Sequence, residues 1–205
     1  MTRLYIVRHG NTFEAGETPR RIGAATDLPL TTTGVAQAEA LGQHFAGRVA
    51  FARAFSSPLR RTRSTAEAIL ARQVHPPLLE TLTLLTEIDH GPDENRTEDE
   101  VVARIGGSAI ALWDEKGIAP DGWNAGADWR LPGWRDFAAS LCAEHPDDAI
   151  LLVTSNGAAR FALLAFDSKS VDKIGNYKLR TASYALIELD CDRRIRLLDW
   201  GRRPD

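Results

Sequence analysis

The chain has 205 residues, of which 43% are hydrophobic and 26% charged, a composition that supports a sizeable core and excludes an extensively disordered protein. Lys and Arg number 25 against 28 Asp and Glu, so the net charge of -3 argues against a nucleic-acid-binding protein, which needs a basic face. No stretch approaches the ~18 apolar residues of a membrane span, and no signal-peptide pattern follows Met1. Because Cys142 and Cys191 are isolated, we expect a cytoplasmic protein without a disulfide framework.

The first half of the chain begins with a predicted buried strand. The apolar run at residues 4–7 indicates this strand. Residues 11–30 are rich in Gly, Thr and Pro and lack periodicity, which predicts a long loop, and loops of this length are usually functional. After the loop we expect, in chain order, a helix over residues 31–46, a strand over 54–57, a helix over 59–72 and a partly extended segment over 78–88.

The second half of the chain predicts further alternation of helices and strands. Thr97 and Glu100 form a capping-box pattern, which opens a helix expected to reach about Lys116 and to break or kink at Gly106-Gly107. We then expect, in chain order, a loop over residues 117–133, a helix over 134–144, a strand over 149–154, a helix over 157–166 and a closing pair of strands over 184–189 and 195–200.

This alternation predicts an α/β fold, a three-layer α/β/α sandwich around a mostly parallel central sheet. We expect one domain, with a substrate-selecting insertion around residues 92–133. Ligands of such sheets bind beyond the carboxyl ends of the strands. Three corners follow predicted strands there, and we expect them to converge on one site: Arg8-His9-Gly10, Ser56-Ser57-Pro58 and Ser155-Asn156-Gly157.

The first corner carries the strongest chemical signal. An imidazole such as that of His9 can attack phosphorus, while the guanidinium of Arg8 grips phosphoryl oxygens in a bidentate manner. Gly10 lets the backbone turn and approach a ligand closely. The alternative for His9 is a histidine at a strand end that only satisfies backbone hydrogen bonds.

Four stretches of the sequence occur together in a family pattern. They are Arg8-His9-Gly10-Asn11-Thr12, Asp27-Leu28-Pro29-Leu30-Thr31 with Gly34 and Gln37-Ala38, Ser57-Pro58-Leu59-Arg60-Arg61 with Thr65-Ala66-Glu67, and Glu87-Ile88-Asp89-His90-Gly91. On these residues the chain resembles the histidine phosphatase superfamily, which also holds the cofactor-dependent phosphoglycerate mutases. The match covers most of the first ninety residues and resumes at residues 150–154.

The resemblance implies that His9 is the nucleophile and becomes a phosphohistidine. It implies that Arg8 and Arg61 hold the phosphoryl oxygens, which is the charge neutralisation that phosphoryl transfer requires, and it calls for no metal or cofactor. Arg61, rather than Arg60, has the family spacing from Ser57. We expect Asn11 to bind the phosphate as well.

Glu87 lies where related phosphatases keep an acid that protonates the leaving oxygen and later activates water. Asp89 would point the same way if this segment is extended, and Glu94 is a further candidate. We expect substrate contacts from Arg21, Asp89 and His90. The alternative for these charged side chains is exposure to solvent.

The sequence departs from the family after the late strand, because Ser155 stands where the second catalytic histidine is expected. Losing one preorganised donor typically costs ~2.7–4 kcal/mol, on the order of 10² to 10³ in rate. We expect Ser155 and Asn156 to bind phosphate with neutral hydrogen bonds, and the N-terminus of the following helix favours anions. His90 is the one histidine whose place in the sequence lets it compensate.

We predict a phosphatase that hydrolyses a small phosphate monoester through a phosphohistidine on His9. Two alternatives stay open: a non-catalytic member that binds a phosphorylated ligand or a protein partner, and a phosphotransferase of the phosphoglycerate mutase type. We expect no nucleic-acid or membrane partner. The sequence names neither the substrate nor the oligomeric state.

Overall fold

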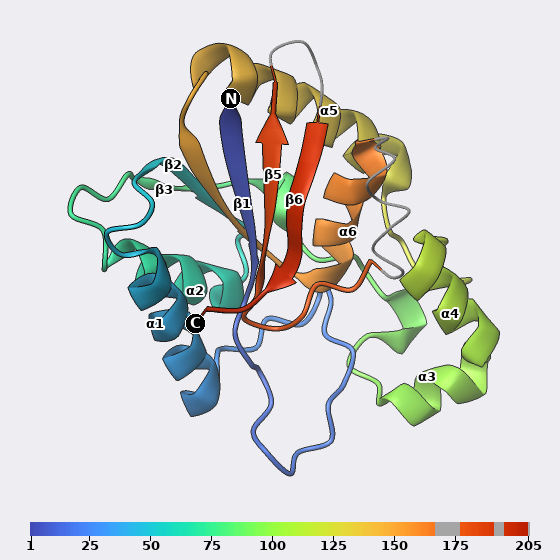
Figure 1. Cartoon of the computed structure of the whole chain (residues 1–205). Helices are drawn as coiled ribbons and strands as arrows, with labels where there is room; N and C mark the ends of the chain where they lie inside the picture. Colours follow the sequence, from blue (N-terminus) through green and yellow to red (C-terminus); the bar gives the residue numbers. More distant parts are fainter. Residues whose placement is uncertain (167–176, 191–194, 205) are drawn as a thin grey trace.

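A mixed six-stranded sheet forms the centre of the computed structural model, which describes residues 1–166, 177–190 and 195–204 (Figure 1). The strands pair in the order β3 (Leu79–Thr81), β2 (Phe51–Ser56), β4 (Ala149–Thr154), β1 (Thr2–Arg8), β5 (Tyr184–Leu189) and β6 (Ile195–Arg202). The first four run parallel, whereas β5 pairs with β1 in antiparallel fashion and β6 pairs with β5 in antiparallel fashion. The predicted α/β sandwich with a mostly parallel sheet is confirmed.

Side chains of β1 alternate between two hydrophobic cores, because successive residues of a strand point to opposite faces of the sheet. Leu4 and Ile6 belong to the core beneath α5 (Ala127–Glu144) and α6 (Asn156–Ala165). Tyr5 and Val7 belong to the core beneath α1 (Thr32–Phe45) and α2 (Arg60–Leu70). The two helical layers therefore place the carboxyl end of β1 between them.

The segment predicted to select substrate forms a lobe beside the sheet, which packs into the core beneath α5 and α6 through Trp113 and Trp123 and whose last residues belong to α5 (Figure 1). It contains α3 (Glu98–Ile105), which opens with the predicted capping box, and α4 (Gly107–Lys116). The break expected between them is present at Gly106, whose φ of 81° suits glycine. Two short 3₁₀ turns, η1 (Thr83–Leu85) and η2 (Gly91–Asp93), precede this lobe.

The prediction of a loop over residues 117–133 is wrong in its last third. Helix α5 begins at Ala127 and runs through Pro132. Proline lacks an N–H donor and usually breaks a helix interior, so the sequence signal opposed a helix here. Arg130 and Trp134, both buried, hold this part of α5 in the core and outweigh the local preference.

Smaller differences concern element ends. Strand β2 begins at Phe51, earlier than the predicted residue 54, and the segment over residues 78–88 contains β3 and η1. The turn expected between β5 and β6 lies mostly outside the described residues, as does Cys191. No helix among the described residues is both long enough and apolar enough to cross a membrane.

The two ends of the loop over residues 11–30 meet at the N-terminus of α1. The N–H of Thr31 donates to the carbonyl of Asn11 at 3.0 Å, and the hydroxyl of Thr31 caps α1 by accepting from the N–H of Gly34 at 3.1 Å. A Cβ atom on Gly34 would lie 2.1 Å from the carbonyl oxygen of Asn11. Only glycine therefore fits at this closure.

We expect Gly34→Ala to lower the free energy of unfolding by about 1–3 kcal/mol, because its added methyl group would overlap backbone atoms. Gly107 is the matched control, since a Cβ there has nothing within 4 Å. Gly107→Ala should leave the free energy of unfolding unchanged or raise it by up to about 1 kcal/mol. Urea unfolding of both variants measures this difference, and equal effects would contradict the tight closure.

Candidate active site

A cavity of about 420 Å³ lies beyond the carboxyl end of β1. Two of the three predicted corners line it, with Arg8, His9 and Gly10 from the first and Asn156 and Gly157 from the last. The corner at residues 56–58 does not line it, because Ser57 is buried and its hydroxyl bonds to Thr62 at 2.6 Å. The structure thus brings the ends of β1 and β4 to one site.

His9 is held in a single orientation at this cavity. Its side chain is buried, and Nδ1 lies 2.7 Å from the carbonyl oxygen of Gly10. A carbonyl oxygen only accepts hydrogen bonds, so Nδ1 carries the proton and Nε2 keeps a lone pair. Burial, followed by the charges of Arg61 and Arg8, holds the pKa of His9 well below its usual value, against the opposing hydrogen bond to Gly10. The imidazole is therefore neutral near neutral pH.

Arg8 and Arg61 place two guanidinium groups near His9. Arg8 lines the cavity, and its Nη1 donates to the carbonyl of Leu179 at 2.8 Å. Arg61 is fully buried behind the cavity wall, with Nη1 donating to Thr26 at 2.7 Å and Nη2 to Gly23 at 3.1 Å. Burial lowers the pKa of both, and the nearby carboxylate of Glu87 opposes this. Arg61 therefore acts on the site through its charge and by holding the loop.

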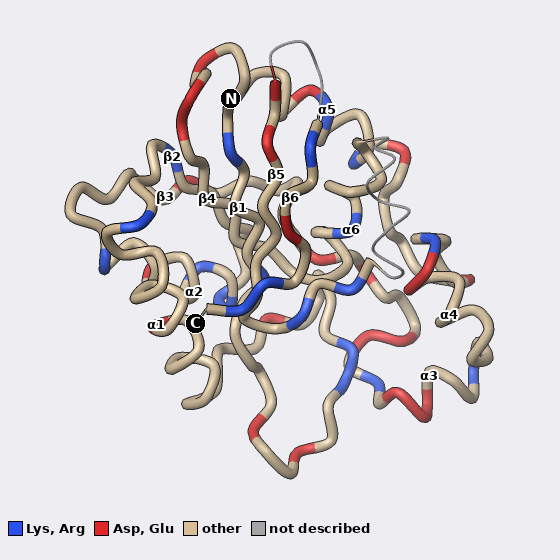
Figure 2. Tube along the Cα trace, in the orientation of Figure 1, with Lys and Arg blue, Asp and Glu red and all other residues tan. Residues whose placement is uncertain are grey.

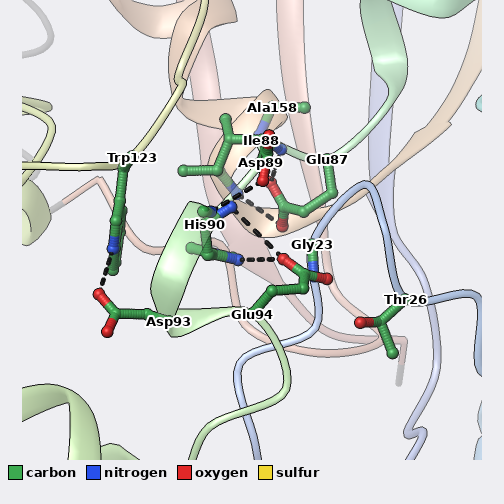
Figure 3. Close-up of polar contacts among 12 residues, drawn as sticks. Gly23, Thr26, Glu87, Ile88, Asp89, His90, Asp93, Glu94, Trp123 and Ala158 are labelled. Atoms are coloured by element: carbon green, nitrogen blue, oxygen red, sulfur yellow. Dashed lines mark hydrogen bonds and ion pairs between the residues drawn. The ribbon is translucent and has the colours of Figure 1, made fainter.

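The carboxylate of Glu87 lines the same cavity and lies at the N-terminus of α6 (Figure 3). It accepts three backbone N–H bonds, from Ile88 at 2.8 Å and from Gly157 and Ala158 at 3.1 Å each. A Cβ atom on Gly157 would lie 2.3 Å from Glu87 Oε1, so glycine is required at this position. The helix N-terminus, which we expected to favour anions, thus holds the carboxylate of Glu87 with the N–H groups of Gly157 and Ala158.

The remaining predicted phosphate ligands differ in their placement. Asn156 and Asn11 line the cavity, and Asn156 Oδ1 also accepts from the N–H of Leu179 at 2.9 Å. Ser155 does not line it: the residue is fully buried, and its hydroxyl has no hydrogen-bond partner among the described residues. The expected neutral hydrogen bonds can thus come directly from Asn156 and Asn11.

Of the three predicted substrate contacts, Arg21 and His90 line the cavity and Asp89 does not. The backbone of Asp89 pairs with that of Asn124 in an isolated antiparallel β-bridge, and the carboxylate of Asp89 accepts from the N–H of Gly91 at 2.8 Å, where η2 begins. Arg21 Nη2 donates to both carboxylate oxygens of Glu98, at 2.8 and 2.7 Å. Asp89, unlike Glu87, therefore lies outside the cavity lining.

His90 and Glu94 join the lobe to the long loop. The ring of His90 packs edge-on against Trp123, with 4.5 Å between centroids, and its Nδ1 lies 3.5 Å from Glu94 (Figure 3). Glu94 accepts from the N–H of Gly23 at 2.6 Å. Burial would raise the pKa of Glu94, but hydrogen bonds from His90, Thr26 and Gly23 lower it to about 2. Glu94 thus connects the long loop to the lobe and does not line the cavity.

The sequence pattern missed several residues around the cavity. Asp114, Lys178 and Thr181 line it but belong to no local motif. Arg160 is fully buried, donates to Asp114 at 3.1 Å and lies 4.0 Å from the ring of Trp113. Burial lowers its pKa to about 10, while Asp114 and Glu87 oppose this. Among the described residues no three His, Cys, Asp or Glu side chains gather as a metal site would require.

The fold and the cavity define an α/β domain with a ligand site at the carboxyl ends of its parallel strands. The family model of the histidine phosphatase superfamily (branch 1) matches residues 4–202. The 2,3-bisphosphoglycerate-dependent phosphoglycerate mutase 2 of Gloeobacter violaceus is 31% identical over 179 residues, which cover 85% of this chain and 80% of that protein. The chain therefore belongs to the histidine phosphatase superfamily, as its motifs predicted.

Solved structures agree with this fold. A mycobacterial glucosyl-3-phosphoglycerate phosphatase superposes with a TM-score of 0.80 at 24% identity, covering 98% of this chain and 99% of its own. The alpha-ribazole phosphatase of Shigella flexneri gives a TM-score of 0.73 at 21% identity, with coverages of 98% and 96%. At these identities the likeness establishes the fold.

The low pKa of Glu94 makes its contribution to stability dependent on pH. Its value of about 2 in the folded protein lies below the ordinary 4.5, so the contribution is full above pH 4.5 and is lost as the pH falls through 2. We expect Glu94→Gln to cost about 2–3 kcal/mol of unfolding free energy at pH 7 and about 1–2 kcal/mol less at pH 3. Denaturant unfolding at both pH values measures this.

The exposed glutamate Glu39, on α1, provides the control for the chemical change. Glu39→Gln should change the free energy of unfolding by less than about 0.5 kcal/mol at either pH. A cost of Glu94→Gln that is the same at pH 7 and pH 3 would show that the charge of Glu94 is not what ties the loop.

Proposed function

We propose that this protein hydrolyses a small phosphate monoester through a phosphohistidine intermediate on His9, without a metal ion. One observation supports this function above the others: the buried, neutral imidazole of His9 is oriented by Gly10 and lies beside the positive charges of Arg8 and Arg61. A neutral imidazole with its Nε2 lone pair available is the form that attacks phosphorus.

Two steps complete the proposed reaction. In the first, His9 Nε2 forms a bond to phosphorus and the bond from phosphorus to the leaving oxygen breaks. Glu87, which has to be in its protonated form for this step, gives that oxygen its proton and is left as a carboxylate. In the second, water attacks the phosphohistidine, Glu87 takes a proton from the water, and the imidazole leaves. Glu87 suits both steps because it lines the same cavity as His9, whereas Asp89 and Glu94 do not.

The phosphoryl oxygens would be held by Arg8, Asn11 and Asn156, which all line the cavity. Arg61 would stabilise the negative charge from behind the wall, since charge neutralisation is the main requirement of phosphoryl transfer. A role for Ser155 rests on its place in the sequence, where the family's second histidine is expected. His90, which precedes the lobe in the chain, lines the cavity and is the candidate to supply an imidazole in place of that histidine.

We propose that the lobe formed by residues 92–133 selects the substrate, because Glu98, Trp113 and Asp114 from this lobe line the cavity. The relatives are named as a phosphoglycerate mutase and a glucosyl-3-phosphoglycerate phosphatase. Their names support a small phosphorylated substrate and keep a mutase-type phosphotransfer as an alternative. A non-catalytic phosphate-binding role is the other alternative, motivated by the serine at position 155.

The nucleophile test compares two histidines. His9→Ala should reduce hydrolysis of an aryl phosphate by roughly 10³-fold or more, because the covalent route is lost. His75 is exposed and distant from the cavity lining, so His75→Ala serves as the control and should retain the rate. Mass spectrometry without acid should find the phosphoryl group on His9. Phosphate binding without turnover in the unmodified protein would favour the non-catalytic role.

The charge state of His9 gives a second prediction. Because burial and two neighbouring arginines lower its pKa, His9 should stay neutral as the pH falls through 6.5, the ordinary histidine value. Titration of the histidine ring signals by NMR measures this, with the His9 signal identified by its loss in His9→Ala. A midpoint at or above 6.5 would contradict the proposed state of the nucleophile.

A further inference from the structure

A second cavity, of about 520 Å³, adjoins the cavity beside His9. It lies between α1, residues 178–182 and the residues that follow β6. We call it the adjoining cavity. Arg8 and Asn11 line both cavities, so the two share a wall. A ligand group in the adjoining cavity would therefore be a neighbour of a phosphoryl group at His9.

The adjoining cavity differs from the first in its charge. All four of its charged lining residues are cations: Arg8, Lys178, Arg180 and Arg203. The cavity beside His9 is balanced, because four acids (Glu14, Glu87, Glu98 and Asp114) face its four Arg and Lys side chains. No acid among the described residues lines the adjoining cavity, although the chain as a whole carries a net charge of -3. Its positive charges repel one another, and a bound anion would relieve that repulsion.

Arg180 and Arg203 are the two charged residues that line the adjoining cavity and not the first, and both are exposed. Neither forms an ion pair within the described parts of the chain. Neighbouring arginines behave differently, since Arg196 pairs with Glu188 at 3.1 Å and Arg202 with Asp199 at 3.3 Å. Figure 2 shows basic residues both on the chain after β6 and on the loop that enters β5.

The loop that carries Lys178 and Arg180 is fastened to the residues of the first cavity. The N–H of Leu179 donates to Asn156, its carbonyl accepts from Arg8, and the N–H of Ala182 donates to the carbonyl of His9 at 3.2 Å. These bonds fix the loop before any ligand arrives, so little ordering is needed on binding. They also fix its position relative to His9.

We propose that the adjoining cavity is a second anion subsite, which binds a carboxylate or phosphate group while a phosphoryl group occupies the cavity beside His9. Such a group has two sources: a second anionic group on the substrate itself, or a separate free anion. The first source rests on the proposed phosphatase function, whereas the second does not.

The experiment uses Arg180→Gln/Arg203→Gln, a double variant that removes the two charges unique to the adjoining cavity. Arg63→Gln/Arg72→Gln is the control of equal charge change, since both residues are exposed and line neither cavity. Arg180→Lys/Arg203→Lys keeps the charge. Thermal unfolding of all three establishes that they fold.

The first measurement compares kcat/KM for 4-carboxyphenyl phosphate with kcat/KM for its methyl ester. If the subsite binds the substrate's second anion, the ratio of acid to ester should fall about tenfold or more in the Gln double variant, as expected for loss of charge-assisted hydrogen bonds. The lysine variant should recover most of the ratio, and the control should keep it.

The second measurement is the stoichiometry of inorganic phosphate binding by calorimetry. A change from two phosphates to one in the Gln double variant, with the ratio of acid to ester unaltered, assigns the subsite to a free anion. If neither the ratio nor the stoichiometry distinguishes this variant from its control, the subsite does not exist. If the unmodified protein hydrolyses neither 4-carboxyphenyl phosphate nor its methyl ester, the proposed phosphatase function fails. The stoichiometry of phosphate binding then still tests whether the subsite exists.

Discussion

One buried carboxylate, that of Glu87, balances the positive charge in the interior of this protein. Burial lowers the pKa of four arginines, and the charge of Glu87 raises the pKa of each of them: Arg8, Arg61, Arg130 and Arg160. The carboxylate of Glu87 also closes the N-terminus of α6 through three backbone N–H bonds. Other carboxylates contribute as well, since Asp114 pairs with Arg160 and the charges of Asp27 and Glu94 also raise the pKa of Arg61. The carboxyl end of the sheet thus combines buried cations with carboxylates that compensate them.

The long loop after β1 is held by the same residues that set the charge of the site. Arg61 binds the carbonyls of Gly23 and Thr26, and Glu94 binds the N–H of Gly23. The backbone of Arg21 pairs with that of Arg96, which ties the loop to the lobe. The cavity wall and the cations around His9 therefore form one unit. We therefore expect a change in the loop to alter the electrostatics around His9 even when the changed residue touches no ligand.

The parts of this fold that follow local rules could be predicted from the sequence. Apolar strands, helix caps and the glycine at position 106 act over a few residues, and so does the corner at His9. The missed features depend on partners far along the chain. Glu87 accepts a hydrogen bond from Gly157, about seventy residues later in the chain. Helix α5 continues through Pro132 because residues such as Arg130 are buried in the core. Asp89 lies outside the cavity lining, where its backbone pairs with Asn124, a partner that the local sequence pattern does not reveal.

The two ends of the described chain lie at opposite ends of the sheet (Figure 1). Met1 contacts Asp147, beside the amino end of β1, whereas Arg203 and Pro204 line the adjoining cavity. A tag added to the carboxyl end would thus follow residues that line that cavity, whereas a tag before Met1 would lie at the other end of the sheet. We expect an affinity tag or fusion partner to disturb the adjoining cavity less when it is attached before Met1.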